Sequence, residues 1–396
     1  MSRIQELIKE MCPNGVRYKT VNELISNKII VTVTPSFKVK KNEYKKIGII
    51  PIISQEEEFI SGYCDKEDSH ITKRNYVCFG DHSEHIKFID FPFVQGADGL
   101  KIMYTNEKEL LGKFFYHTAL STYKRYNNYE RHFKYFCEIK IPIPPLKVQE
   151  EIVRILDKFG ELEAEIEAEL EARQSQYEFW SGKIFESHMN GKIKHITDIA
   201  MIKARVGWQR LTTAEYLSTG DYYLITGTDF KNDGKIDFNK CVFVTKERYE
   251  MDENIQVHKN DILITKDGTL GKVAYLNDEP DKLTTLNSGV FRIKVTDKNV
   301  LPRYIYHYFN SKVFRDFVEY VKTGSTIPHL TQEKLVSLNI PMPNIKEQEK
   351  IINILDKFED LTRSFSVGLP AEIELRRKQY EHYRNQLLSF KELNND

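Results

Sequence analysis

Two stretches of this chain carry nearly the same sequence. IPIPPLKVQEEIVRILDKFGEL occupies residues 141–162, and IPMPNIKEQEKIINILDKFEDL occupies residues 340–361, 199 positions later. The two stretches are identical at 13 of 22 positions, far more than unrelated segments share. A repeat of this length indicates an architecture built from two related halves, so we expect a tandem repeat and not one irregular domain.

Each copy predicts an extended lead-in followed by a helix. The prolines at the start push the residues before them toward an extended backbone. Apolar residues then recur at alternating spacings of three and four, which is typical of a helix with a narrow apolar seam, as in a coiled coil. We expect the two seams to bury against each other in an antiparallel pair that relates the halves by a pseudo-twofold axis. The seam positions are Ile152, Ile155, Phe159 and Leu162 in the first copy and Ile351, Ile354, Phe358 and Leu361 in the second.

A second block of similarity shows that the two helical regions differ in length. Residues 169–180 and 372–383 are identical at 6 of 12 positions, but their offset is 203 and not 199. The second copy has therefore gained four residues near Gly368-Leu369-Pro370. Glycine and proline predict a break or kink there. Each helical region runs about 40 residues, or on the order of 60 Å if unbroken.

The segments ahead of the helices predict mixed α/β domains. Residues 259–277, KNDILITKDGTLGKVAYLN, indicate a strand, an Asp-Gly turn and a second strand. Other β-branched or aromatic runs bounded by turn residues predict further strands. We expect an α+β fold with mixed domains at residues 1–146 and 191–345, a first long helix at 147–190, and a second long helix with a C-terminal tail at 346–396. The expected strands are Lys28–Thr34, Tyr76–Phe79, Ile86–Ile89, Tyr222–Thr226, Cys241–Thr245, Ile262–Thr265, Lys272–Leu276 and Val290–Val295.

Composition narrows the class of protein. No apolar run approaches the roughly 18–20 residues that a membrane span needs, and MSRIQELIKEM lacks the apolar stretch of a secretion signal. The five cysteines are scattered and never in CxxC spacing, which favours reduced thiols over disulfides or a zinc cluster. We expect a cytoplasmic protein that does not associate with a membrane.

The order of these segments closely resembles the specificity subunit of type I restriction–modification systems. The resemblance rests on the I-P-x-P and Q-E-x-I-x-x-I-L-D motifs before each helix and spans essentially the whole chain. KDGTLGK (266–272), GSTIPHLTQEKLVSLNIPMP (324–343) and YERHFKYFCEIKIPIP (129–144) look like landmarks of that family's target recognition domains. The resemblance implies two domains that read a bipartite double-stranded DNA target with an unread gap. It also implies that the helices separate these domains and dock methyltransferase (modification) subunits, with restriction/translocase subunits in the full complex.

Catalytic motifs are absent from the sequence. It contains no NPP[FY] loop of an adenine methyltransferase, no GxxxxGK[ST] loop of an ATP-driven translocase and no HExxH pair for a metal. Glu138-Ile139-Lys140 has the E-x-K form found in nucleases, but the nearest preceding aspartate is Asp98, so a strand end is the better interpretation. We therefore expect no catalysis, metal or cofactor in this chain. S-adenosylmethionine, ATP and Mg are expected on partner subunits.

The first domain has one dense candidate for DNA contact, YKRYNNYERHFKYF at residues 123–136. Lysine and arginine suit phosphates, whereas the side chains of Asn127 and Asn128 can pair with adenine edges. The alternative is an aromatic helix packed on the core with a solvated basic face. The candidate DNA-binding residues are Lys124, Arg125, Asn127, Asn128, Tyr129, Arg131, His132 and Lys134.

The second domain has two candidate segments. One is the turn with Lys266, Thr269 and Lys272, which also fits an ordinary hairpin. The other is a polar loop whose glycine and small hydroxyl residues permit close approach to DNA, although it also fits a plain helix-to-strand connection. The candidates in this loop are Thr323, Ser325, Thr326 and His329.

Three further interpretations stay open at this point. The chain could serve a related system in which one partner both methylates and cuts, or it could be a coiled-coil scaffold without a nucleic-acid role. An enzyme is disfavoured by the missing motifs. Residues 147–190 carry 5 basic and 11 acidic side chains, so we expect this helix to face solvent or a basic partner and not DNA.

Overall fold

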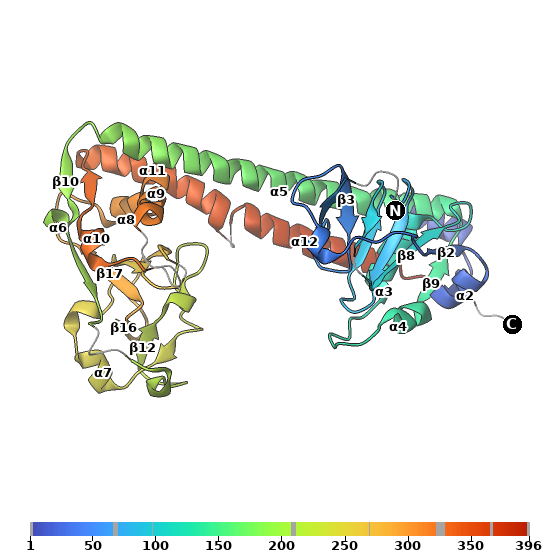
Figure 1. The fold of residues 1–396 in the computed structure, drawn as a ribbon, viewed down its shortest axis with the longest axis horizontal. Helices are drawn as coiled ribbons and strands as arrows, with labels where there is room; N and C mark the ends of the chain where they lie inside the picture. The colour runs from blue at the N-terminus through green and yellow to red at the C-terminus, as the bar shows by residue number, and fades with distance from the viewer. Residues whose placement is uncertain are drawn as a thin grey trace. The chain divides into compact units, whose positions relative to one another are not determined.

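The computed structural model describes residues 3–65, 70–96, 98–206, 211–268, 270–321, 329–364 and 367–393. The chain divides into two compact units, Met1–Ala164 with Leu375–Asp396, and Glu165–Glu374 (Figure 1). Each unit contains one globular domain and the adjoining parts of the long helices. The division expected at residues 146, 190 and 345 separates helices from domains and stays a prediction, because the compact units cut across the helices.

The globular part of unit 1 is built on a four-stranded antiparallel sheet in the order β2-β8-β5-β6. A three-stranded sheet, β4-β3-β7, lies beyond it, and β1 pairs with β9 next to the long helix. The elements are α1 (Arg3–Met11), β1 (Arg17–Thr20), α2 (Val21–Ser26), β2 (Ile30–Val33), η1 (Lys41–Glu43), β3 (Ile50–Ile53), β4 (Gly62–Cys64), β5 (Tyr76–Gly80), β6 (Ile86–Ile89), β7 (Val94–Gln95), β8 (Leu100–Thr105), α3 (Gly112–Thr122), α4 (Phe133–Glu138) and β9 (Lys140–Ile143).

The globular part of unit 2 repeats this topology. Its sheets have the orders β11-β17-β14-β15 and β13-β12-β16, and β10 pairs with β18. Each three-stranded sheet contains one parallel pair, β3 with β7 and β12 with β16. The elements are β10 (Ile193–His195), α6 (Ile196–Ile199), β11 (Ala200–Ala204), η4 (Thr213–Glu215), β12 (Tyr222–Ile225), η5 (Gly227–Asp229), β13 (Val242–Phe243), α7 (Lys246–Glu250), η6 (Glu253–Ile255), β14 (Ile262–Thr265), β15 (Val273–Tyr275), β16 (Leu283–Leu286), β17 (Val290–Val295), α8 (Pro302–Asn310), α9 (Lys312–Val321), α10 (Gln332–Val336) and β18 (Asn339–Pro341).

The long helices follow the predicted pattern, including the break in the second region. Helix α5 (Leu146–His188) is continuous, whereas the second region consists of α11 (Ile345–Arg363) and α12 (Leu369–Leu387). Pro370 lies in the first turn of α12, where its missing N–H costs nothing. A Cβ on Gly368 would collide with the carbonyl oxygens of Asp360 and Leu361, so the end of α11 requires glycine at this position.

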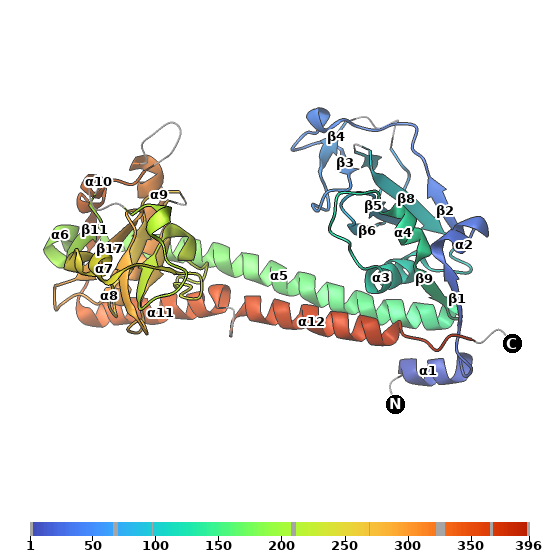
Figure 2. The same cartoon turned by 90° about the horizontal axis from the view of Figure 1, so that it is seen from below.

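The two helical regions form an antiparallel pair. Near its start, α5 runs beside α12 (Figure 2). There the ring of Phe159 lies 5.4 Å from that of Tyr383 and 6.5 Å from that of Tyr380. Near its end, α5 contacts α11, where Tyr177 lies 6.3 Å from Phe358. Tyr177 and Tyr380 are equivalent in the repeat, so each unit uses the same aromatic pair. The α+β tandem repeat with an antiparallel coiled coil is confirmed.

The expected seam-to-seam packing holds for Phe159 and Phe358 but is wrong for four other seam positions, Ile152, Ile351, Ile354 and Leu361. Ile152 lies in the core of the first globular domain, together with Leu156 and Phe114, and Ile351 lies in that of the second. Ile354 and Leu361 are 48% and 37% exposed instead of buried. The physical reason is that each helix packs against its own domain as well as the other helix, which moves its most buried face onto the neighbouring residues Leu156 and Leu355.

Adjacent residues on α11 should therefore differ sharply in their effect on stability. Leu355 is fully buried, whereas Ile354 is 48% exposed. We expect Leu355→Ala to lower the free energy of unfolding by about 2–5 kcal/mol, the usual loss for a buried leucine, and Ile354→Ala to lower it by less than about 1 kcal/mol. Urea unfolding of the two variants measures the difference, and equal losses would contradict the observed helix orientation.

Candidate nucleic-acid interface

In both units, a backbone hydrogen bond ties the segment ahead of a short helix, α4 or α10, to the turn that follows a central strand, β5 or β14. We call this bond the hook. In unit 1, the N–H of His132 donates to the carbonyl of Asp81 at 2.8 Å. In unit 2, the N–H of Leu330 donates to the carbonyl of Lys266 at 3.1 Å. The turns themselves are tied alike, since Asp81 N–H donates to Gly99 and Lys266 N–H donates to Gly289. The candidate residues of the two domains therefore lie at equivalent places in the fold.

The candidate segment of unit 1 is an extended loop and not a helix. Helix α4 begins only at Phe133, and the inward rings of Phe133 and Phe136 pack against Phe79. The alternative of an aromatic helix on the core thus holds for α4 alone. The loop and the first turn of α4 expose seven candidate side chains, namely Lys124, Arg125, Asn127, Asn128, Tyr129, Arg131 and Lys134.

His132 was wrongly predicted as a DNA contact. Its side chain is 0% exposed, and its Nε2 lies 3.0 Å from the carbonyl oxygen of Asn128. Its ring also stacks with that of Tyr126 at 5.7 Å. The sequence of a basic and aromatic run does not reveal which of its side chains point inward. Here the buried ring of His132 contacts the loop backbone at Asn128.

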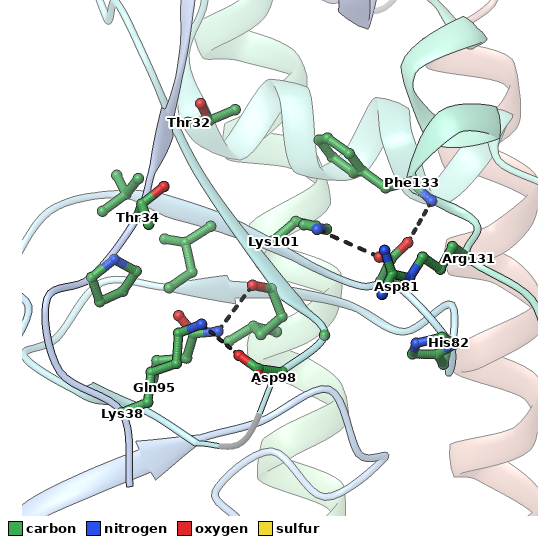
Figure 3. Close-up of a pocket in the computed structure, with 15 residues that line it drawn as sticks. Thr32, Thr34, Lys38, Asp81, His82, Gln95, Asp98, Lys101, Arg131 and Phe133 are labelled. Atoms are coloured by element: carbon green, nitrogen blue, oxygen red, sulfur yellow. Dashed lines mark hydrogen bonds and ion pairs between the residues drawn. The ribbon is translucent and has the colours of Figure 1, made fainter.

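A polar pocket of about 500 Å³ lies beside this loop (Figure 3). Lys101 lies 3.4 Å from Asp81, and Lys38 is 2.5 Å from Asp98. Arg131 reaches the rim of the pocket, and within the described part of the chain its guanidinium has no ion pair or hydrogen bond. The other polar side chains of the lining are Thr32, Thr34, His82 and Gln95.

Sequence reasoning missed the lysines of this pocket. Lys38 follows β2 and Lys101 lies on β8, so no single segment of sequence brings them together. The only local signal is that Lys101 stands between the buried Leu100 and Ile102, which is the alternation of a strand with one outward face.

Two other cations among the candidates of unit 1 have protein partners. Nη2 of Arg125 lies 2.9 Å from Nδ1 of His85. Burial, followed by the nearby charge of Arg125, lowers the pKa of His85, so the ring is neutral and accepts this hydrogen bond. Lys134 lies 3.6 Å from Glu130. Both cations are exposed, and such surface pairs are weak, so these partners leave them available to a polyanion.

In unit 2, the structure brings three candidates to the turn between β14 and β15. Lys266 extends over the ring of Phe291 at 5.3 Å, and the N–H of Lys272 donates to Oγ1 of Thr265 at 2.9 Å. His329 is held by Asp267 at 2.6 Å. The remaining candidates of this domain, Thr269, Thr323, Ser325 and Thr326, lie outside the described residues.

Each domain is joined to its long helix by a buried glutamine. Gln149 accepts a hydrogen bond from the N–H of Leu111 at 2.9 Å and donates to the carbonyl of Pro144 at 2.8 Å. Gln348 makes the same two bonds with Leu301 and Pro343, both at 2.9 Å. These bonds connect the start of the domain's helix, the proline lead-in and the long helix.

An aspartate about two helical turns after the glutamine, on the same long helix, completes each junction. Asp157 contacts Lys113 at 2.6 Å and His117 at 3.4 Å, and Asp356 contacts Arg303 at 2.8 Å and His307 at 2.7 Å. Burial alone would raise the pKa of both aspartates, but their basic partners lower it below the ordinary value. Both carboxylates are therefore charged at neutral pH.

One group near this junction in unit 2 has the spacing of metal ligands. Oxygen and nitrogen atoms of His307, Asp356 and Glu359 lie within 4.8 Å of one another. Arg303, however, pairs with Asp356 at 2.8 Å and with Glu359 at 2.5 Å. Its guanidinium bridges the two carboxylates, and a second cation, Arg363, lies 3.7 Å from Glu359, so the group is an internal ion-pair network.

No helix among the described residues is both long and apolar enough to cross a membrane.

Comparisons with known proteins agree with the duplicated architecture. The model of the type I restriction modification DNA specificity domain matches residues 26–172 and again residues 190–375. The specificity subunit of the type I restriction enzyme EcoR124I/EcoR124II from Escherichia coli is 30% identical over 382 residues, covering 89% of this chain and 90% of its own. The putative specificity subunit S.HindORF215P from Haemophilus influenzae is 34% identical over 263 residues, or 64% of each chain.

Two solved structures share the fold. The S subunit of a type I restriction–modification system from M. genitalium aligns with a TM-score of 0.53 and 16% identity, covering 94% of this chain and 96% of its own. A chain from a type I R-M system studied for complex assembly and conformational transition aligns with a TM-score of 0.59 and 12% identity, covering 95% and 98%. The two ranges that the family model matches together cover most of the chain. The chain therefore belongs to the type I restriction modification DNA specificity family.

Proposed function

We propose that this chain is the DNA-specificity subunit of a type I restriction–modification enzyme, in which each domain reads one half of a bipartite target. The observation that supports the proposal most directly is the duplicated hook, which presents a different set of exposed polar side chains in each unit. Membership of the family and the name of the Escherichia coli relative support the same role.

In the first domain, we assign contact with DNA to the exposed loop and the pocket beside it. Asn127 and Asn128 offer amides that suit adenine, and Arg131 offers a guanidinium that suits guanine or a phosphate. Lys101 and Lys38 are partly exposed cations whose pairs with aspartates are weak at the surface, so they suit phosphates at the edge of the site. In the second domain, the corresponding contacts come from Lys266, Lys272 and His329, with Thr269, Thr323, Ser325 and Thr326 as further candidates.

Partner subunits supply the chemistry in this proposal. The chain binds double-stranded DNA, and its helices dock methyltransferase subunits that use S-adenosylmethionine. Restriction subunits that use ATP and Mg join the full complex. Because the substrate is cellular DNA, the protein acts in the cytoplasm. A partner that both methylates and cuts, or a scaffold without a role in DNA binding, is disfavoured by the specificity-subunit relatives.

Co-expression with the methyltransferase encoded beside it should give the chain a defined specificity. We expect methyladenine in the host DNA to fall in one bipartite motif with a fixed unread gap, because two separate domains read it. Methylation-sensitive sequencing maps the motif. Replacing residues 1–140 by those of a relative should change one half of the motif only, and methylation without any motif would contradict the proposal.

Arg131 should contribute to DNA affinity without contributing to stability. Its guanidinium is exposed and has no partner among the described residues, so Arg131→Ala removes a contact with DNA and none within the protein. We expect binding about 5–30-fold weaker, the loss of roughly 1–2 kcal/mol, and a salt dependence reduced by about one charge if the contact is a phosphate.

Fluorescence anisotropy of the complex with its methyltransferase, measured at several salt concentrations, tests this expectation. Lys246→Ala is the matched control, because Lys246 is an exposed cation on α7, outside the candidate segments and the long helices, and forms a surface pair with Glu250 at 3.5 Å. Equal affinities for the Arg131 variant, the control and the wild type would remove Arg131 from the interface.

A further inference from the structure

One buried carboxylate forms hydrogen bonds with the loop of unit 1 that carries the candidate DNA-binding residues. Glu84 lies in the turn between β5 and β6 and is only 3% exposed. Its carboxylate accepts hydrogen bonds from the hydroxyl of Tyr123 at 2.7 Å, from the N–H of Tyr126 at 2.8 Å and from the N–H of Asn127 at 2.8 Å. One buried side chain thus fixes three residues of the loop.

The backbone at both ends of this contact has an uncommon conformation. Glu84 has φ +59° and Asn127 has φ +55°, both in the left-handed region. Asparagine tolerates that region, but glutamate rarely occupies it, and its backbone is strained there. The hydrogen bonds of the carboxylate offset this strain, so the conformations of the turn and the loop depend on each other.

Aromatic stacking holds the rest of the loop. The ring of Tyr126 stacks on Tyr135 at 4.5 Å, and that of Tyr129 stacks on His82 at 5.1 Å. The buried ring of His132 places Nδ1 3.6 Å from Glu84. The loop is therefore shaped before any partner binds, with its exposed polar side chains outside and Glu84 beneath.

Glu84 places a negative charge beneath a surface that we propose binds DNA. Burial would raise the pKa of this carboxyl, but the hydrogen bonds from Tyr123, Tyr126 and Asn127 lower it, so the group is an anion at neutral pH. An anion beneath a DNA-binding surface opposes the phosphates by electrostatics alone. Any favourable contribution of Glu84 to DNA affinity must then come from holding the loop in shape.

We infer that Glu84 is a positioning residue for target reading, which holds the loop 123–132 in the conformation that contacts the first half of the target. This inference rests on the proposed function. In unit 2 the equivalent turn, KDGTLGK at residues 266–272, contains no glutamate. The effect of Glu84 is therefore confined to one half of the target.

Glu84→Gln tests the inference because electrostatics and positioning predict opposite signs. Removal of a negative charge near DNA strengthens binding if charge alone matters. If Glu84 positions the loop, the amide leaves at least one of its hydrogen bonds unmade, and binding weakens by about 10-fold, a loss of roughly 1.4 kcal/mol. Anisotropy of the complex with its methyltransferase measures affinity, and mapped methylation should relax in one half of the motif only.

Glu130→Gln is the matched control. Glu130 lies in the same loop with an exposed side chain, which accepts a hydrogen bond from Nδ2 of Asn128 at 3.2 Å, contacts Tyr135 at 3.4 Å and lies 3.6 Å from Lys134. The oxygen of a glutamine at this position can still accept the bond from Asn128. Loss of its charge should leave affinity unchanged or raise it, with the motif intact. Tyr123→Phe is a milder second variant that deletes one donor to Glu84 and keeps every charge, and we expect binding about 3-fold weaker.

The outcomes separate the inference from the proposed function. Weaker binding by both the Glu84 and Tyr123 variants, with one half-site relaxed and the unfolding midpoint within a few degrees of the wild type, supports positioning. A Glu84→Gln complex that binds as tightly as the wild type, with the same motif, overturns it. If that variant does not fold, Tyr123→Phe decides by the same criterion. A wild-type complex without sequence preference overturns the proposed function as well.

Discussion

The buried amide of Gln149, repeated at Gln348, is the interaction on which the arrangement of each unit depends. Gln149 also donates to the carbonyl of Glu109 at 3.0 Å, and Gln348 donates to that of Asn299 at 3.1 Å. Each amide therefore joins the loop before the domain's helix, the N-cap residue of that helix and the proline lead-in. A buried amide is costly unless its hydrogen bonds are made, so these geometries are strongly coupled and the same motif recurs at both ends of the repeat.

The repeated motif and the variable surfaces have separate tasks. The glutamine and aspartate junctions, the aromatic pairs Phe159–Tyr380 and Phe358–Tyr177, and the antiparallel helices are nearly the same in the two units. The exposed side chains differ, with Arg131 in one domain at the place of His329 in the other. A chain built this way can change what it reads without altering how its domains are attached, which is what a specificity subunit requires.

Much of the fold could be predicted because its signals are local. The bounds of β14 and β17, the Asp-Gly turn between β14 and β15, and the break near Gly368 follow from short-range alternation and from glycine and proline. Burial could not be predicted as well, because it depends on contacts between distant segments. Ile354 and Leu361 were wrongly placed inside and His132 outside. Lys38 comes from the segment after β2, Lys101 from β8 and Glu84 from a turn, and only the folded sheet brings them to the loop.

The most direct test of the account is hydrogen–deuterium exchange of the complex between this chain and its methyltransferase, with and without target DNA. We predict that DNA slows exchange in two separate places, at residues 81–85 with 123–132 in the first domain and at residues 266–272 with 329–331 in the second. The junction peptides containing Gln149 and Gln348 should exchange slowly in both states. Protection confined to the long helices, with no change in either loop, would contradict the assignment of target reading to the hooked surfaces.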